Sequence, residues 1–199
     1  MSERVTPDIT AALAALAAAL QRVGQPSMVI GGVAVIARGV PRLTVDIDAV
    51  VLAEELDLDL LWRELACVGF EARIPNAAEF ARQRQMLLLT HPASGMPVDL
   101  SLGWLTFEKD AMARATPLTL GGVTLPVATA EDLVVFKAIA WRDVDKSDIR
   151  ELVVRHGDQM SFERIRRTLS QFFEILEVPE RMAQLEALIR KALSDADQA

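Results

Sequence analysis

Residues 28–52, MVIGGVAVIARGVPRLTVDIDAVVL, form the stretch on which the rest of the chain depends. A short apolar run ends at Gly31-Gly32, a helix-length segment reaches Pro41, and a second apolar run follows Thr44. Glycine permits a tight turn, and proline does not continue a helix. The stretch therefore predicts a strand, a glycine turn, a short helix and a second strand, in that order.

The second predicted strand carries two carboxylates, Asp46 and Asp48. Side chains alternate between the two faces of a strand, so this pair would share one face, with Cα atoms about 6.5–7 Å apart. We expect Val45, Ile47 and Ala49 to point the other way, into a core. Adjacent carboxylates repel each other and a divalent cation relieves that repulsion, whereas the alternative is a solvated acidic face.

The two glycines can bring backbone N–H groups close to an anion. Together with Val33 they would open the predicted helix, where unpaired N–H groups and the helix dipole favour a phosphate. A Gly-Gly pair alone is usually only a turn. Here the pair precedes two carboxylates, so a phosphate site would adjoin a metal site.

This combination resembles the signature of the nucleotidyltransferase superfamily with the DNA polymerase β type fold. In that signature Gly-Gly or Gly-Ser precedes Asp-x-Asp or Asp-x-Glu by roughly a dozen residues. Residues 33–45 separate Gly32 from Asp46 in this chain. The resemblance covers Met28 to about Leu152 and implies an α/β (α+β) fold, a mixed β-sheet core with flanking helices. Within the superfamily it is greatest to the AbiEii-like group of stand-alone nucleotidyltransferases, some of which are toxins of toxin–antitoxin pairs.

A third acidic residue, Asp99, lies between apolar neighbours in the predicted strand 98–101. A carboxylate buried there without a partner would be costly, but it fits if its face is the one that carries Asp46 and Asp48. The superfamily pattern has a third carboxylate on a neighbouring strand, and the resemblance assigns Asp99 to it. The alternative is an exposed residue at the edge of the sheet.

Two downstream motifs of the AbiEii-like group also have counterparts. Lys137 and Arg142 match a Lys-x4-Arg element. In the Lys-Asp-x-x-Asp element that follows, Ser147 stands where the pattern has its first Asp, so that Asp is missing or replaced by Asp145. Asp148 matches the later Asp, and the resemblance is looser here than at the first motif.

The resemblance implies transfer of a nucleoside monophosphate from a nucleoside triphosphate, for instance ATP, with release of pyrophosphate and with Mg²⁺ or Mn²⁺ as the cofactor. Catalytic roles fall to four acidic residues, Asp46, Asp48, Asp99 and Asp148, of which the first three would be metal ligands and the last would orient or deprotonate the acceptor. Nucleotide contacts fall to Gly31, Gly32, Val33, Arg42 and Lys137. For Lys137 and Asp148 the alternative is a surface salt bridge between helices.

Two regions are expected, a nucleotidyltransferase core domain at 1–128 and a C-terminal helical region at 129–199. In the core domain we predict helices at 6–23, with Thr6 as N-cap and Pro7 first in the helix, and at 54–68 and 106–114. Further strands are predicted at 70–74 and 83–90, with a hairpin of 116–120 and 123–127. A loop or a turn of helix should cover 75–80 and a turn 91–97, and Thr129 should cap the first helix of the second region.

Composition narrows the choice of cofactor. The chain has 199 residues, 51% of them hydrophobic, which is enough for a full core. We expect its single cysteine, Cys67, to be a small core residue. One cysteine and two histidines cannot form a cysteine- or histidine-rich metal site, so a hard ion held by carboxylates is favoured.

Charge and hydropathy restrict the partners. The net charge of −7 argues against a broad nucleic-acid-binding surface. The longest uncharged apolar segment, 9–20, is too short to span a bilayer and lacks the features of a signal peptide, so a cytoplasmic protein without membrane contact is expected. The arginines that could form a local positive patch, or else be scattered and solvated, are Arg38, Arg42, Arg73, Arg82 and Arg84.

The acceptor stays open between an RNA 3′ end, a protein and a small molecule. The chain contains no tyrosine, so it cannot modify its own, and its few positive charges favour a small acceptor or an RNA 3′ end. The AbiEii-like resemblance adds an antitoxin as a candidate partner. The alternatives are a non-catalytic nucleotide- or partner-binding module of the same fold and a small-molecule enzyme of the antibiotic nucleotidyltransferase type.

Overall fold

The computed structural model describes residues 8–196, which form two compact units. The first unit contains residues 8–37 and 43–128, and the second contains residues 38–42 and 129–196. The sequence pattern predicts a single boundary after residue 128. The structure additionally groups the short segment Arg38–Arg42 with the second unit.

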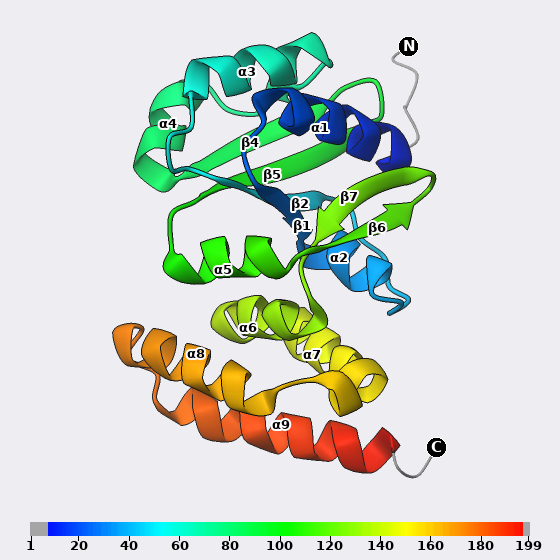
Figure 1. The fold of residues 1–199 in the computed structure, drawn as a ribbon, viewed down its shortest axis with the longest axis vertical. Coiled ribbons are helices and arrows are strands. Elements are labelled where there is room, and N and C mark those ends of the chain that lie inside the picture. The colour runs from blue at the N-terminus through cyan, green and yellow to red at the C-terminus, as the bar shows by residue number, and fades with distance from the viewer. Residues whose placement is uncertain (1–7, 197–199) are drawn as a thin grey trace. The chain divides into compact units, whose positions relative to one another are not determined.

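The first unit is built on one mixed sheet, with strand order β3-β4-β5-β2-β1-β7-β6 (Figure 1). Its strands are β1 Ser27–Ile30, β2 Ile47–Leu52, β3 Glu71–Ala72, β4 Met86–His91, β5 Met96–Gly103, β6 Thr116–Leu120 and β7 Val123–Val127. β1 is antiparallel to β2 and parallel to β7, and β2 is parallel to β5. The predicted α/β class with a mixed sheet is therefore confirmed, as is the hairpin of β6 and β7.

Residues 28–52 form the predicted strand, turn, helix and strand. β1 leads directly into α2, Gly31–Ala37, and a loop then leads to β2. β2 has a strand on each side, and Ile47 and Ala49 are buried while Asp48 between them is half-buried. The prediction that Val45 lies in the core is wrong, because the strand begins only at Ile47 and Val45 is 78% exposed in the preceding loop.

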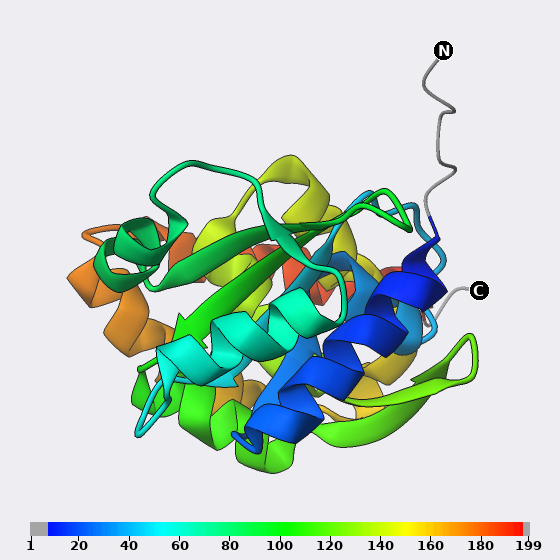
Figure 2. The same ribbon diagram turned by 90° about the horizontal axis from the view of Figure 1, so that it is seen from above.

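Four more helices belong to the first unit, α1 Ile9–Val23, α3 Leu58–Cys67, α4 Ala77–Arg84 and α5 Thr106–Arg114. α1 and α3 lie side by side on one face of the sheet and α5 lies on the other (Figure 1, Figure 2). α1 begins at Ile9, with Asp8 Oδ1 accepting from the N–H groups of Thr10 and Ala11. The predicted cap, Thr6, and Pro7 lie outside the described residues.

Three other predictions for this unit are wrong. The strand predicted at 83–90 begins only at Met86, because residues 77–84 form α4 and a positive φ at Gln85 ends this helix. Of the two alternatives for 75–80, the structure contains the helix. Pro97 lies in β5, where pairing with β2 starts only at Val98, so its missing N–H is not needed on that side. Cys67 is exposed at the end of α3, away from the buried Leu61 and Leu65.

Helices make up the second unit within the described residues. They are α6 Ala130–Ala140, α7 Asp143–His156, the short 3₁₀ helix η1 Gly157–Gln159, α8 Phe162–Ile175 and α9 Glu180–Ala196. Thr129 caps α6 as predicted, its Oγ1 accepting from Asp132 N–H at 3.1 Å. The Arg181 guanidinium of α9 lies 5.9 Å from the Trp141 ring and 5.7 Å from the Phe173 ring, which connects α9 to α8 and the end of α6. Between residues 8 and 196 there is no helix with the length and apolarity that a membrane span requires.

Candidate functional site

Gly31 marks the point where β1 turns into α2 beside Asp48. Its φ is +63°, and a Cβ placed on it would lie 1.9 Å from Asp48 Oδ2. The carboxylate of Asp48 thus lies directly against the Gly31 backbone at the start of α2, where the helix dipole favours negative charge. The predicted phosphate contacts of Gly31, Gly32 and Val33 would be made at this same turn, and they stay predictions.

A single row of residues crosses the sheet through Asp48 and Asp99. Ile30 is the Cα partner of Asp48, Asp48 of Asp99, and Asp99 of Leu88. The row continues to Arg73, whose N–H donates to Leu88 O at 2.9 Å. We call these five residues the carboxylate row. Paired positions project to the same face, so Asp48, Leu88 and Asp99, all half-buried, share one face of the sheet.

Asp99 makes an ion pair within this row. Arg73 Nη2 contacts Asp99 Oδ1, and the two side chains are 32% and 30% exposed. The strand that carries Asp99 therefore lies beside the strand of Asp48, as predicted, and Asp99 is not a solvated residue at the sheet edge. The sequence predicts Arg73 only as one of several arginines that form a positive patch or are scattered, and it does not predict the pair with Asp99.

Asp46 lies one residue before β2, at the end of the loop that precedes it. Thr44 Oγ1 donates to Asp46 Oδ1 at 3.1 Å and lies 3.2 Å from the Asp46 carbonyl oxygen. The prediction that Asp46 and Asp48 share one strand is therefore wrong, because β2 begins only at Ile47 and the half-buried Asp46 lies in the preceding loop.

The donor chemistry of Asp46, Asp48 and Asp99 fits a hard divalent cation, because all three offer carboxylate oxygens and two of them are register partners. As the side chains stand, no three His, Cys, Asp or Glu residues between 8 and 196 are gathered closely enough to hold a metal ion. In this arrangement the Asp99 carboxylate forms an ion pair with Arg73. The three-carboxylate metal site therefore stays a prediction.

The second unit contains a separate set of charges, which we call the buried ion cluster after its buried members Lys137, Asp145 and Asp148. Arg42 and Arg142 complete the cluster with side chains that are 22% and 70% exposed. Lys137 Nζ lies 3.1 Å from Asp145 Oδ1 and 2.8 Å from Asp148 Oδ2, and all three side chains are at most 7% exposed. Arg42 Nη1 contacts the same Asp148 oxygen at 2.5 Å. Lys137, Asp148 and Arg42, predicted for one site, thus lie together, in a buried rather than a surface salt bridge.

Asp145 is the member of this cluster that the sequence pattern leaves without a defined role. Its Oδ2 accepts from Arg142 N–H at 3.0 Å and from Arg142 Nε at 2.7 Å, so it both caps α7 and holds the arginine. Burial alone would raise the pKa of Asp145, but the hydrogen bonds from Arg142 and Lys137 outweigh burial and hold the pKa below its ordinary value. The spacing Arg142-x-x-Asp145 at a helix start was the available signal.

The remaining arginines of the predicted patch have different environments. Arg82 and Arg84 are exposed in the last turn of α4, and Arg38 belongs to the second unit. Burial lowers the pKa of the Arg38 guanidinium, an effect that Asp132 partly offsets. Arg42 and Arg73 instead pair with Asp148 and Asp99.

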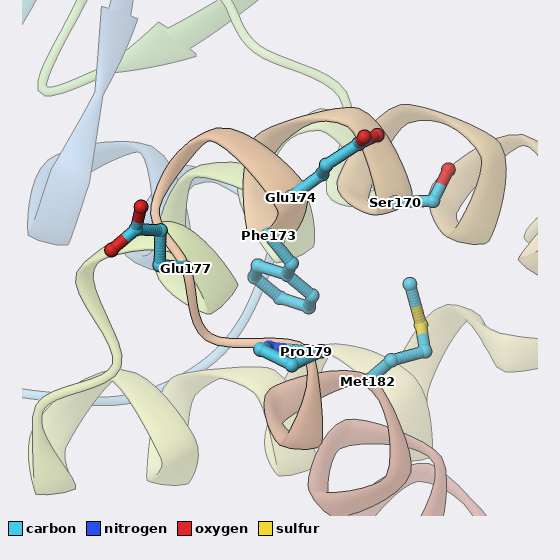
Figure 3. Close-up of a pocket in the computed structure, with 6 residues that line it drawn as sticks. All are labelled: Ser170, Phe173, Glu174, Glu177, Pro179 and Met182. Carbon is cyan, nitrogen blue, oxygen red and sulfur yellow. The ribbon is translucent and has the colours of Figure 1, made fainter.

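A pocket of about 490 Å³ lies in the second unit, between the end of α8, the following turn and the start of α9 (Figure 3). Figure 3 shows Phe173 pointing from α8 toward Pro179. The residues around this pocket are Ser170, Phe173, Glu174, Glu177, Pro179 and Met182. They include none of the residues predicted for the site, so this pocket is separate from the candidate chemistry.

A match of residues 7–187 to a nucleotidyltransferase family defines the class of protein: the chain belongs to the nucleotidyltransferase superfamily. More narrowly, residues 7–187 match the family described as "Nucleotidyltransferase of unknown function (DUF6036)", and the chain belongs to this family. The description of this family does not mention the AbiEii-like group, so membership of that group stays a prediction. Comparison with curated proteins gives no match.

Solved structures of antibiotic-modifying enzymes share the fold. The solution structure of the antibiotic-resistance factor ANT(2'')-Ia is 18% identical with a TM-score of 0.58, and the match covers 84% of this chain and 94% of that one. A crystal structure of ANT(2")-Ia with adenylyl-2"-tobramycin is 16% identical with a TM-score of 0.56, covering 85% and 99%. The lincomycin-bound lincosamide antibiotic adenylyltransferase LnuA is 16% identical with a TM-score of 0.51, covering 74% and 97%. At such identities the similarity is one of fold.

Proposed function

We propose that this chain transfers a nucleoside monophosphate from a nucleoside triphosphate to an acceptor hydroxyl. The observation that carries the proposal is the carboxylate row, in which Asp48 and Asp99 are register partners on parallel strands and Asp48 lies against the Gly31 turn. Membership of a nucleotidyltransferase family supports the reaction class. Carboxylates on a rigid sheet suit this chemistry, because phosphoryl transfer depends mostly on positioning and on compensation of charge.

In the proposed reaction the acceptor oxygen attacks the α-phosphorus as it loses its proton, and the bond between the α-phosphorus and the pyrophosphate oxygen breaks. Asp46, Asp48 and Asp99 would hold Mg²⁺ or Mn²⁺, which when bound supplies positive charge against the triphosphate. All three residues are half-buried, and Asp48 and Asp99 share one face of the sheet. The amides of Gly31, Gly32 and Val33 would contact phosphate oxygens.

We propose nucleotide contacts for Arg42 and Lys137 and acceptor orientation for Asp148. These three residues are connected by ion pairs, so their roles are not independent. Lys137 shares its charge between Asp145 and Asp148, and Asp148 also contacts Arg42. The position of each of these side chains therefore depends on the whole buried ion cluster. Replacing one member should disturb the other members.

For the acceptor we favour a small molecule with a hydroxyl group. A net charge of −7 gives little attraction for a long nucleic acid. The similar structures named above include adenylyltransferases of antibiotics, which also makes ATP the first donor to test. An RNA 3′ end and a protein hydroxyl are the next acceptors to test. A triphosphate donor makes the cytoplasm the expected compartment.

The AbiEii-like resemblance adds a second proposal, that the protein is the toxic member of a toxin–antitoxin pair with an antitoxin as its partner. Growth arrest on expression of the wild type, absent with Asp48→Asn, would support this role. Normal growth of cells that contain active wild-type enzyme would exclude it.

Calorimetry of nucleotide binding tests the proposed site directly. Asp46→Asn and Asp48→Asn should abolish binding of the Mg²⁺–nucleotide complex and leave the melting temperature unchanged or raised, because repulsion between carboxylates is relieved. Asp110→Asn on α5, an exposed position, is the matched control and should bind as the wild type does. Unchanged affinity in both Asp46 and Asp48 variants would remove these residues from the site.

A further inference from the structure

Arg73 completes the carboxylate row from the side opposite to Gly31. It follows the short strand β3 and its backbone N–H donates to Leu88 O, so its backbone belongs to the sheet. Neighbouring strands are about 4.8 Å apart, so the side chain must extend past one whole strand to reach Asp99. The reach of arginine allows this contact, and Arg73 Nη2 pairs with Asp99 Oδ1.

The position of Arg73 matters because of what lies beyond Asp99. Asp48 is the register partner of Asp99 on the next strand, and like charges at directly opposed positions of a sheet are destabilising. Arg73 supplies a positive charge to one of these two carboxylates. Its side chain is still 32% exposed, so the pair is accessible to an ion from solvent.

We infer that Arg73 is an internal counter-cation for Asp99, which a divalent cation displaces when it binds to the carboxylates of this row. The inference rests on the proposed function, because it takes Asp48 and Asp99 as the metal ligands. Arg73 and the ion compete for oxygens of the same carboxylate. Arg73 is thus a positioning residue: it holds Asp99 in place and neutralises it before the ion arrives.

Titration with Mn²⁺ alone, without nucleotide, measures this competition, with free Mn²⁺ followed by electron paramagnetic resonance. Removal of the competing guanidinium in Arg73→Ala should tighten Mn²⁺ binding by about two- to fivefold, the upper part of the range expected from the strength of exposed ion pairs. Arg73→Lys, which keeps the charge with a shorter side chain and no planar fork, should give an intermediate affinity. If Arg73→Ala does not fold, Arg73→Gln takes its place.

A matched control separates direct competition from a general change of charge. Arg84→Ala removes an equal charge from an exposed position in α4, the helix that follows Arg73 in the chain. It should change Mn²⁺ affinity less than about twofold, because exposed charges at a distance are screened by salt. Equal tightening in Arg73→Ala and Arg84→Ala would overturn the assignment.

A second readout follows the guanidinium itself. In protein with ¹⁵N-labelled arginine, the Arg73 side-chain signal is identified by its loss in Arg73→Ala. It should shift as Mg²⁺ is added to the wild type and stay fixed in Asp99→Asn. An Arg73 signal that does not respond to saturating Mg²⁺ would show that the pair with Asp99 persists.

The variants also distinguish this inference from the proposed function. If Asp48→Asn loses Mn²⁺ binding while Arg73→Ala binds as the wild type does, only the role of Arg73 is wrong. If Asp48→Asn and Asp99→Asn both bind Mn²⁺ as the wild type does, the metal site itself is wrong, and the role of Arg73 with it. Tighter binding in Arg73→Ala and weaker binding in both Asp variants would support both.

Discussion

Position 31 requires a backbone with positive φ and leaves no room for a Cβ, and only glycine meets both requirements. Its φ of +63° lies in the left-handed region, and the Asp48 carboxylate occupies the place of a Cβ. The Gly-Gly signature can therefore be understood from one close approach, between the turn after β1 and the first carboxylate of β2. Gly32 is buried in α2 and is not among the glycines with positive φ.

Gly31→Ala should lower the free energy of unfolding by about 2–5 kcal/mol, since the left-handed conformation costs about 1–2 kcal/mol and overpacking costs about 1–3 kcal/mol. Gly122→Ala in the β6–β7 turn is the control: its φ is +83°, but nothing lies within 4 Å of the added Cβ. That variant should lose only the conformational part, about 1–2 kcal/mol. Urea unfolding compares the two variants, and equal losses would contradict the close approach of Asp48.

The candidate site shows what can be predicted for single residues. The adjacency of Asp48 and Asp99 follows from the sequence, because a lone Asp among apolar strand residues needs a polar neighbour. The pair of Arg73 with Asp99 could not be predicted. It depends on β4 lying between their strands and on the register Leu88↔Asp99, which no local pattern specifies.

Among the elements, those bounded by strong local signals are the ones that the sequence predicts best. α5 and the β6–β7 hairpin have the predicted bounds, the latter because Gly121 and Gly122 both take positive φ. α4 has no such signal: only Ala81 of its eight residues is buried, so an apolar periodicity is lacking. The bounds of α4 therefore depend on its tertiary packing against β4 rather than on its local sequence.

The N-terminus of α7 is held by the charge of one residue, Asp145. Asp145, fully buried, holds Arg142 and Lys137, so Asp145→Asn leaves two cations less well compensated. Because Lys137 keeps Asp148 as a partner and the Arg142 side chain is 70% exposed, we expect a loss of about 1–3 kcal/mol in the free energy of unfolding at neutral pH, measured by urea unfolding. Asp143→Asn, in the same helical turn but fully exposed, should have little effect.

The pH dependence of this loss has a definite sign. The folded-state pKa of Asp145 lies below its ordinary value of 3.8, so its carboxylate stabilises the fold fully above pH 3.8. This stabilisation disappears as the pH falls through the folded-state pKa. The difference between wild type and Asp145→Asn should therefore be constant near neutrality and shrink in acid. A difference that grows on acidification would contradict the ion-pair account.

For the whole molecule, the sequence predicts the class of protein better than it predicts the acceptor substrate. The superfamily follows from residues 28–52, and the match of residues 7–187 to a nucleotidyltransferase family agrees with it. The acceptor cannot be predicted in the same way, because it depends on surfaces that the signature does not include. Net charge gives only a direction, away from long nucleic acids.

Transfer of label from α-³²P nucleoside triphosphates in the presence of Mg²⁺ tests the central claim most directly. ATP comes first, offered with a panel of hydroxyl-bearing small molecules, RNA 3′ ends and proteins. The wild type and Asp110→Asn should release pyrophosphate and label one acceptor class, and Asp48→Asn and Asp99→Asn should be slower by about a hundredfold or more. Equal rates in all four proteins, or nucleotide binding by the wild type without any pyrophosphate release, would contradict the account.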